Sequence, residues 1–174
     1  VVGIAKGYME TAPTLDLAAI DDQAQTSFIY DANGNLITEY KGSENRVIVS
    51  IQAMPTYLQH AFIAVEDARF YTHNGVDIKR IVGAFVSNLS SSSTQGGSTI
   101  TQQLVRNTIL QEEQFDSTIE RKVREAYIAI KMEDMYSKDE ILMMYLNTIY
   151  YGHGAYGIEA AAETYLSKTA ADLT

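Results

Sequence analysis

Apolar and polar residues follow a strand-like pattern in the first third of this chain and a helical pattern afterwards. Two short runs rich in β-branched and aromatic residues, Ser27–Tyr30 and Leu36–Tyr40, flank the turn sequence Asp31–Gly34. An Asn-Gly pair between such runs is typical of a β-hairpin. Arg46–Val49 is a candidate for a third strand, and residues 1–25 predict a short helix followed by a polar linker.

Beyond residue 54, apolar residues recur every three or four positions, which is the spacing of amphipathic helices. Pro55 suits the first position of a helix, Ser137 and Glu140 have capping-box spacing, and Gly152 is a stop signal. The small polar residues of Ser90–Gly97 predict a mobile loop. The predicted helices cover about 55–70, 98–110, 117–135, 137–151 and 158–167.

These patterns predict a mainly α fold with a small N-terminal β-hairpin element, in one domain over residues 26–174 that follows a linker segment, 1–25. Two predicted helices carry apolar stripes that we expect to face the core. The stripes consist of Leu58, Ala61, Phe62 and Val65 in the first helix and Ile119, Val123, Tyr127 and Ile130 in the third.

Composition excludes several classes of protein. The 174 residues include 46% hydrophobic ones, enough for a single core, and the net charge of −9 argues against a nucleic-acid partner. With no cysteine, the chain has neither a disulfide nor a thiolate site. No apolar run reaches about 18 residues, so no spanning helix is predicted. The abrupt ends at Val1 and Thr174 suggest a piece of a longer protein, truncated at its C-terminal end.

Glu66 is the first residue with candidate chemistry. In a continuous helix it would share one stripe with Phe62 and Phe70, so its carboxylate would lie between two phenyl rings. Partial desolvation of this kind makes a carboxylate a better general base. The more ordinary alternative is an ion pair with Arg69. His73 fits a hydrogen-bonded structural histidine better than a metal ligand, because no HExxH-like pattern surrounds it.

Two further elements could bind an anion. Gly96–Thr99 leads into a helix, where free amides and hydroxyls suit a diphosphate, and Gln102, Gln103 and Arg106 follow within two turns. The stretch from Thr118 to Lys131 has four basic residues against two acidic ones. There Arg121 and Lys122 could hold a diphosphate while Glu125 seats a divalent cation; the alternative is an ion pair on a wet surface.

Four motifs occur in a fixed order, and together they resemble the successive motifs of glycosyltransferase family 51. This family includes the class A penicillin-binding proteins and the monofunctional peptidoglycan glycosyltransferases. The motifs read Glu66-Asp67-x-x-Phe70-Tyr71-x-His73-x-Gly75, Gly96-Gly97-Ser98-Thr99-Ile100-Thr101-Gln102-Gln103, Arg121-Lys122-x-x-Glu125 and Lys138-x-x-Ile141-Leu142-x-x-Tyr145-Leu146-Asn147. The match covers about 55–168 closely and the hairpin region loosely.

The resemblance implies a lysozyme-like, two-lobed glycosyltransferase fold that polymerises lipid II into β-1,4-linked glycan strands. It implies that Glu66 is the general base, and that Glu125 assists the diphosphate leaving group through a divalent cation, Mg or Mn. Arg106 stands where many relatives have lysine, which keeps the charge but changes the contact with phosphate. The implied substrate-binding residues are Asp67, Phe70, Ser98, Thr99, Gln102, Gln103, Arg106, Arg121 and Lys122.

The same resemblance implies a place on the extracytoplasmic face of the bacterial plasma membrane, with the anchor outside these residues, and binding of moenomycin-type inhibitors. We expect a membrane-facing apolar patch in the first lobe, although a core-facing helix would show the same pattern. The candidates for this patch are Val82, Phe85, Val86 and Leu89.

Two other functions compete with this prediction. A lysozyme-like peptidoglycan hydrolase or lytic transglycosylase would also use one cleft glutamate as an acid, but it has no diphosphate to stabilise and no use for the basic residues at 121–125. A non-catalytic cell-wall binding module has no evident need for both Glu66 and Glu125.

Overall fold

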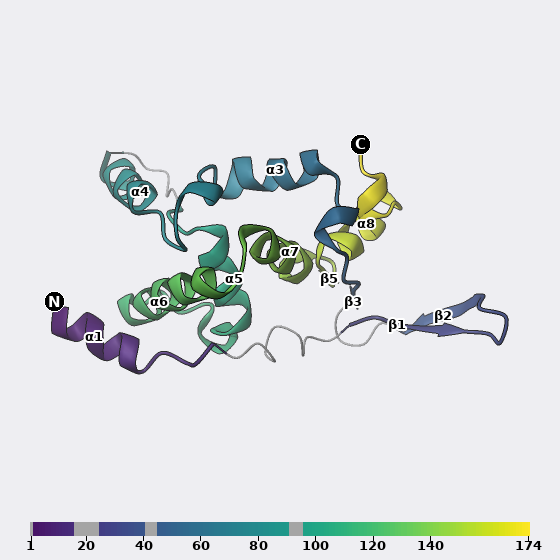
Figure 1. The fold of residues 1–174 in the computed structure, drawn as a ribbon, viewed down its shortest axis with the longest axis horizontal. Helices are drawn as coiled ribbons and strands as arrows, with labels where there is room; N and C mark the ends of the chain where they lie inside the picture. The colour runs from purple at the N-terminus through teal and green to yellow at the C-terminus, as the bar shows by residue number, and fades with distance from the viewer. Residues whose placement is uncertain (1, 16–24, 41–44, 91–95) are drawn as a thin grey trace.

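The computed structural model describes residues 2–15, 25–40, 45–90 and 96–174, and within these ranges the chain is mainly helical, as predicted (Figure 1). Short 3₁₀ turns occur at Ile51–Ala53, Phe70–Thr72, Gln111–Glu113 and Ala170–Asp172. The helices are α1 (Val2–Glu10), α3 (Thr56–Glu66), α4 (Ile78–Ser90), α5 (Ile100–Thr108), α6 (Ile119–Met135), α7 (Lys138–Thr148) and α8 (Ile158–Leu166). In Figure 1, α3 and α4 lie above α5, α6 and α7.

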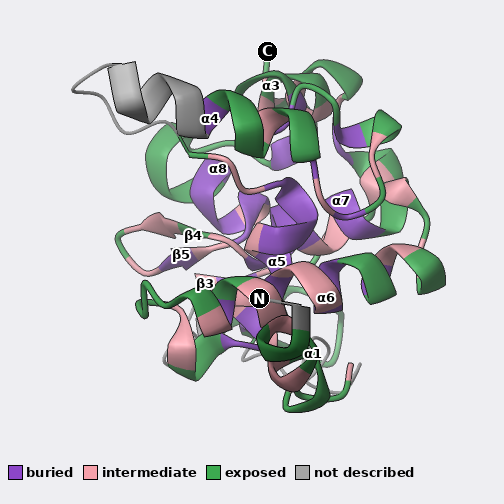
Figure 2. Ribbon diagram, turned by 90° about the vertical axis from the view of Figure 1, so that its left-hand side faces the viewer, coloured by how far each residue is buried: buried purple, intermediate pink, exposed green. Residues whose placement is uncertain are grey.

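Helix α5 lies at the centre of the core, where it packs against both α6 and α7 (Figure 2). The apolar residues of α5 are fully buried because neighbouring helices cover them on two sides. They meet the apolar faces of α6 and α7 in one continuous cluster. Its fully buried members include Ile100, Leu104 and Val105 from α5, Met132 from α6, and Ile141, Leu142 and Leu146 from α7.

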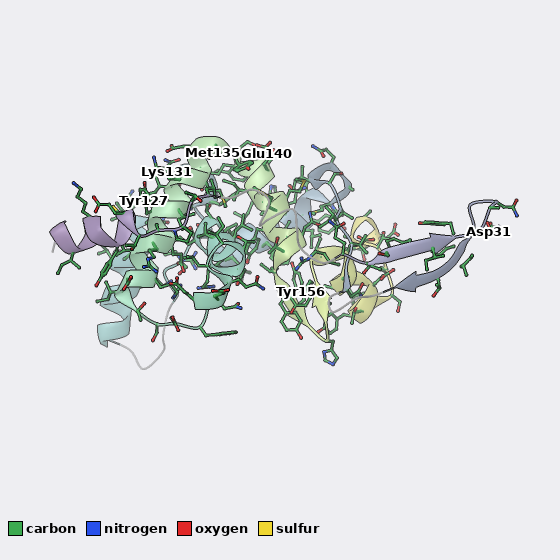
Figure 3. The ribbon with its side chains drawn as sticks, turned by 90° about the horizontal axis from the view of Figure 1, so that it is seen from below. Asp31, Tyr127, Lys131, Met135, Glu140 and Tyr156 are labelled. Atoms are coloured by element: carbon green, nitrogen blue, oxygen red, sulfur yellow. The ribbon has the colours of Figure 1, made fainter. Side chains whose placement is uncertain are left out.

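The predicted hairpin is confirmed. Strands β1 (Ser27–Tyr30) and β2 (Leu36–Tyr40) pair antiparallel. Asp31 closes the turn by accepting hydrogen bonds from the backbone N–H groups of Asn33 and Asn35, each at 2.8 Å, and Gly34 adopts a positive φ of 84°. The hairpin projects from the helical body with Asp31 at its tip (Figure 3).

The predicted third strand is wrong in extent. Strand β3 is only Asn45–Arg46, and it runs parallel to β5 (Ala155–Tyr156), which pairs antiparallel with β4 (Tyr150–Gly152). The same small sheet explains why α7 ends at Thr148 instead of continuing to 151. Antiparallel pairing of Tyr150–Gly152 with the neighbouring strand β5 overrides the helical pattern there.

Both predicted apolar stripes are only partly right: Leu58, Phe62 and Tyr127 pack against the core, but the fully buried residues of these helices are others. In α3 the buried residue is Ile63, while Val65 is 77% exposed. In α6 the face toward the core carries Arg121, Glu125, Ile128, Ala129 and Met132, and Ile119 is 79% exposed. Arg121 and Glu125 neutralise each other as an ion pair, so they can lie on the face toward the core. The spacing of apolar residues alone does not reveal such a pair. The predicted mobile loop, Ser90–Gly97, lies mostly outside the described residues.

Gly75, in the first motif, lies close to the backbone of α6. It has φ +80°, and a Cβ placed on it would lie 2.7 Å from the backbone carbonyl atoms of Ala129 in α6. We expect Gly75→Ala to cost more than about 3 kcal/mol of unfolding free energy, because backbone strain and a backbone clash add. Chemical denaturation measures this loss.

Gly34→Ala is the matched control. Gly34 has nearly the same φ, +84°, but a Cβ there meets no atom within 4 Å. This variant should lose only the strain, about 1 kcal/mol. Equal losses in the two variants would contradict the close approach of Gly75 to α6.

Candidate functional site

Glu66 is the last residue of α3, where the chain leaves the helix at Asp67 (φ −159°, ψ 71°). Its half-buried carboxylate faces α5, and Oε2 accepts a hydrogen bond of 3.0 Å from Nε2 of Gln103. An apolar hollow of about 220 Å³ opens beside it, lined by Ala61, Phe62, Val65 and Glu66 itself. The predicted neighbour Phe62 is therefore present. The predicted second ring, Phe70, is not on this helix and is buried in the core.

Asp67 joins the first motif to the start of α5. Its side chain is fully buried, and Oδ2 accepts hydrogen bonds from the backbone N–H of Ile100 at 3.0 Å and from Nε2 of His73 at 2.9 Å. His73 is thus a hydrogen-bonded structural histidine, as expected. Substrate contact by Asp67 and Phe70 stays a prediction, since the observed contacts of both residues are internal.

Thr99 and Gln102 form a capping box at the N-terminus of α5. The hydroxyl of Thr99 accepts from the backbone N–H of Gln102, and Oε1 of Gln102 accepts from the backbone N–H of Thr99, both at 3.1 Å. The Thr99 hydroxyl also donates to the carbonyl oxygen of Gly75 at 2.6 Å. Both side chains are buried, so the more accessible groups of this motif are Ser98, Gln103 and Arg106.

Glu125 is fully buried on α6 and is surrounded by donors. Arg121 donates to Oε2, while Lys122 donates to Oε1 at 2.9 Å and Gln102 approaches the same oxygen at 3.4 Å. The alternative of an ion pair on a wet surface is therefore wrong: Arg121 is also buried. Lys122 reaches farther, donating to the hydroxyl of Ser98 at 2.9 Å, and thereby links the second and third motifs.

Charge in this cluster is unbalanced toward the positive. Two cations, Arg121 and Lys122, surround the single carboxylate of Glu125. Arg106, one turn beyond Gln102 and Gln103, has no ion pair or hydrogen bond within the described ranges. Such an arrangement suits a dianionic group better than a neutral sugar, because fixed positive charge is already in place.

Adjacent residues of α5 contact the two glutamates. Gln102 reaches Glu125 and Gln103 reaches Glu66, so one helix sets the spacing of both carboxylates. Sequence reasoning missed two contributors to this arrangement. Arg80 of α4 donates to the backbone carbonyl oxygen of Glu66, and Tyr145 of α7 donates to Gln103. Tyr145 belongs to the fourth motif, which was the available signal for it.

The residues fit a protein-held metal ion poorly. Both oxygens of Glu125 already accept hydrogen bonds from cationic groups. Within the part of the chain that the structure describes, no cluster of three or more His, Asp or Glu side chains could hold a metal ion. A divalent cation, Mg or Mn, at Glu125 stays a prediction, and no chemical step is assigned to it.

The burial of Glu125 predicts that the ion pair with Arg121 matters for the stability of the fold. Glu125→Gln leaves Arg121 buried without its counter-charge, which should cost about 3–5 kcal/mol of unfolding free energy. Glu120→Gln is the control on the same helix, since Glu120 pairs with Arg124 from a side chain that is 41% exposed. Its loss should stay below about 1 kcal/mol. Similar unfolding midpoints for the two variants in urea would contradict the buried cluster.

Comparisons with known proteins identify the family of this chain. A family model described as Transglycosylase matches residues 33–174. The chain is 44% identical to Penicillin-binding protein 1A of Clostridium perfringens (strain 13 / Type A), over 99% of this chain and 26% of that protein. It is 48% identical to Penicillin-binding protein 1A/1B of Bacillus subtilis (strain 168), over 97% of this chain and 19% of that protein.

A third relative, Penicillin-binding protein 1A of Streptococcus pneumoniae (strain ATCC BAA-255 / R6), is 42% identical over 95% of this chain and 23% of its own length. The chain thus spans about a quarter or less of the length of these relatives. Because the family match covers most of the chain, the resemblance inferred from the four motifs is confirmed. The chain belongs to the transglycosylase family, glycosyltransferase family 51.

Proposed function

We propose that this domain is a peptidoglycan glycosyltransferase that polymerises lipid II into β-1,4-linked glycan strands. The observation that carries the proposal is the pairing of Glu66 and Glu125 through neighbouring residues of α5. One carboxylate is half-buried beside an apolar hollow, and the other is fully buried among cations. Two glutamates in such different surroundings suit two different roles in one reaction.

Glu66 takes the role of general base in this proposal. It accepts the proton of the acceptor's 4-hydroxyl while that oxygen forms a bond to the anomeric carbon of the donor. The bond from this carbon to the lipid diphosphate breaks at the same time, which inverts the α linkage to β. The diphosphate leaves with the bonding electron pair, and the cations at Arg106, Arg121 and Lys122 stabilise its charge. Glu125 keeps two of these cations in position.

The geometry disfavours the competing functions. A hydrolase or lytic transglycosylase protonates a glycosidic oxygen and leaves no diphosphate, so it gains nothing from a buried glutamate that holds two cations. A binding module does not need a carboxylate that is held by one amide next to an apolar hollow. The family match likewise favours the glycosyltransferase.

A membrane location is part of the proposal. Removing the lipid tail of the substrate from a bilayer costs about 0.8 kcal/mol of free energy for each buried methylene, so the substrate stays in the membrane. No helix among the described residues is both long and apolar enough to span a membrane. The surface of α3 and α4 does expose apolar side chains: Val65, Ile78 at 72% and Val82 at 56%. Of the other patch candidates, Phe85, Val86 and Leu89, the structure describes the backbone in α4 but not the side chains.

We infer that this surface of α3 and α4 faces the extracytoplasmic leaflet of the plasma membrane. A hollow between the two helices adds basic groups to the apolar ones, since Lys79 and Arg80 line it together with the ion pair of Arg69 and Asp77. Basic groups beside exposed apolar side chains suit the headgroup region of a bilayer. Binding of moenomycin-type inhibitors at the cleft belongs to the same proposal, because a phosphate-bearing ligand would meet the same cations.

Replacing the base tests the proposed function. Glu66→Gln keeps the volume and the contact with Gln103 but removes the basicity, so we expect polymerisation of lipid II to fall at least about 100-fold. Glu163→Gln, an exposed glutamate of α8, is the matched control and should retain activity. Turnover close to wild type in the Glu66 variant would remove this residue from the mechanism.

Vesicle binding tests the proposed membrane surface. A charge at Ile78 or Val82 should weaken cosedimentation with phospholipid vesicles about tenfold, because a glutamate cannot enter the apolar layer cheaply. Ile37→Glu, on the projecting hairpin and 63% exposed, is the control and should bind as the parent does. If a folded Val82→Glu variant bound vesicles as well as the parent, the assignment of this surface would be wrong.

A further inference from the structure

Three helices contribute to one chain of hydrogen bonds that ends on Glu66. The hydroxyl of Tyr145 in α7 lies 3.2 Å from Oε1 of Gln103 in α5, and Nε2 of Gln103 lies 3.0 Å from Oε2 of Glu66 in α3. Tyr145 is only 2% exposed, and the core around its ring fixes its position. The carboxylate beside the apolar hollow is therefore connected to a rigid part of the molecule.

The direction of these hydrogen bonds is determined at both ends. An ionised carboxylate accepts hydrogen bonds and cannot donate them, so Gln103 must turn its NH₂ group toward Glu66. Its carbonyl oxygen is then left for Tyr145, which has to donate. Burial raises the pKa of the Tyr145 phenol, and the negative charge of Glu66 raises it further. Tyr145 thus stays protonated at neutral pH and supplies the required donor.

Only one of the two carboxylate oxygens of Glu66 takes part in this chain of hydrogen bonds. Oε2 accepts from Gln103, whereas Oε1 has no hydrogen bond within the described residues. Fixing Oε2 also fixes the direction in which Oε1 points. A general base needs such a held orientation, since the geometry of proton transfer depends on it.

We propose that Tyr145 is a positioning residue of the transferase, which acts through Gln103 to hold the carboxylate of Glu66 so that Oε1 receives the proton of the acceptor hydroxyl. This proposal rests on the proposed function. It assigns the fourth motif a part in the reaction: α7 contributes the donor that orients the amide. Without the Tyr145 hydroxyl, the amide of Gln103 is free to rotate, and the ionised carboxylate loses its held donor.

The full-length protein with lipid II as substrate provides the test. Tyr145→Phe should lower kcat about tenfold while KM changes little, because the variant alters the base and not the binding of the substrate. The acidic limb of the pH profile of kcat/KM should move to higher pH, since a Gln103 amide that Tyr145 no longer holds donates less well to the carboxylate of Glu66. A merely structural role for Tyr145 would leave this limb in place.

Tyr151→Phe is the matched control. Its hydroxyl is also buried and has no hydrogen-bond partner in the described part of the chain, and its ring packs edge-on against Phe62 at 6.0 Å. This variant removes the same atom near Glu66 without breaking the chain of hydrogen bonds. Its pH profile should match that of the parent.

A double-mutant cycle with Gln103→Met isolates the path. In the Gln103→Met background, Tyr145→Phe should have no further effect on the pH profile, because Tyr145 acts only through Gln103. Additive effects of the two substitutions would overturn the proposal. If the parent is active and the Tyr145→Phe variant has the same pH profile as the parent, the proposal is also wrong. An inactive parent would overturn the proposed function and the positioning role with it. If Tyr145→Phe failed to fold, Gln103→Met alone should move the acidic limb, and an unmoved limb would overturn the proposal.

Discussion

The buried carboxylate of Asp67 joins the end of α3 to the start of α5, and the position of Glu66 follows from that contact. Oδ2 accepts the backbone N–H of Ile100, where the helix dipole of α5 favours a negative charge, and the same oxygen accepts a hydrogen bond from His73. Glu66 immediately precedes this anchor, so its carboxylate meets α5 at Gln103. The base is thus placed by its sequence neighbour and not by its own packing.

The rest of the site depends on α5 because this helix is fixed along its whole length. A capping box begins it, and its apolar face lies in the core between α6 and α7. A half-exposed carboxylate and a fully buried one can then be held by two consecutive glutamines of one rigid element. A site built on helices keeps its geometry better than a site built on loops. Displacement of a diphosphate requires such fixed geometry, because the reacting atoms must be aligned.

Local signals in the sequence predicted the local structure well. The Asn-Gly turn of the hairpin and the capping box at Ser137 were found because each depends on residues within five positions of one another. The end of α7 was missed because Tyr150–Gly152 forms a strand with β5, and the partner of β3 was not predicted because it lies about 110 positions away. No local pattern contains such a contact.

The candidate site was predicted in its residues more than in its arrangement. Motif order identified Glu66, Glu125 and their polar neighbours, but periodicity placed Arg121 and Glu125 on a wet face because two charged residues there looked solvated. Their burial depends on mutual neutralisation, with Lys122 and Gln102 completing the set. The contribution of Tyr145 was invisible for the same reason: a tyrosine in an apolar stripe does not show where its hydroxyl points.

In the proposed function, Glu66, Glu125 and the cations around them serve the displacement of a lipid diphosphate. The most direct test of this function is incubation of the protein with labelled lipid II in the presence of a divalent cation, followed by separation of the products by length and analysis of the new linkage. We expect long glycan strands with β-1,4 linkages and release of the lipid diphosphate. Unreacted lipid II, together with shortening of added peptidoglycan, would contradict it.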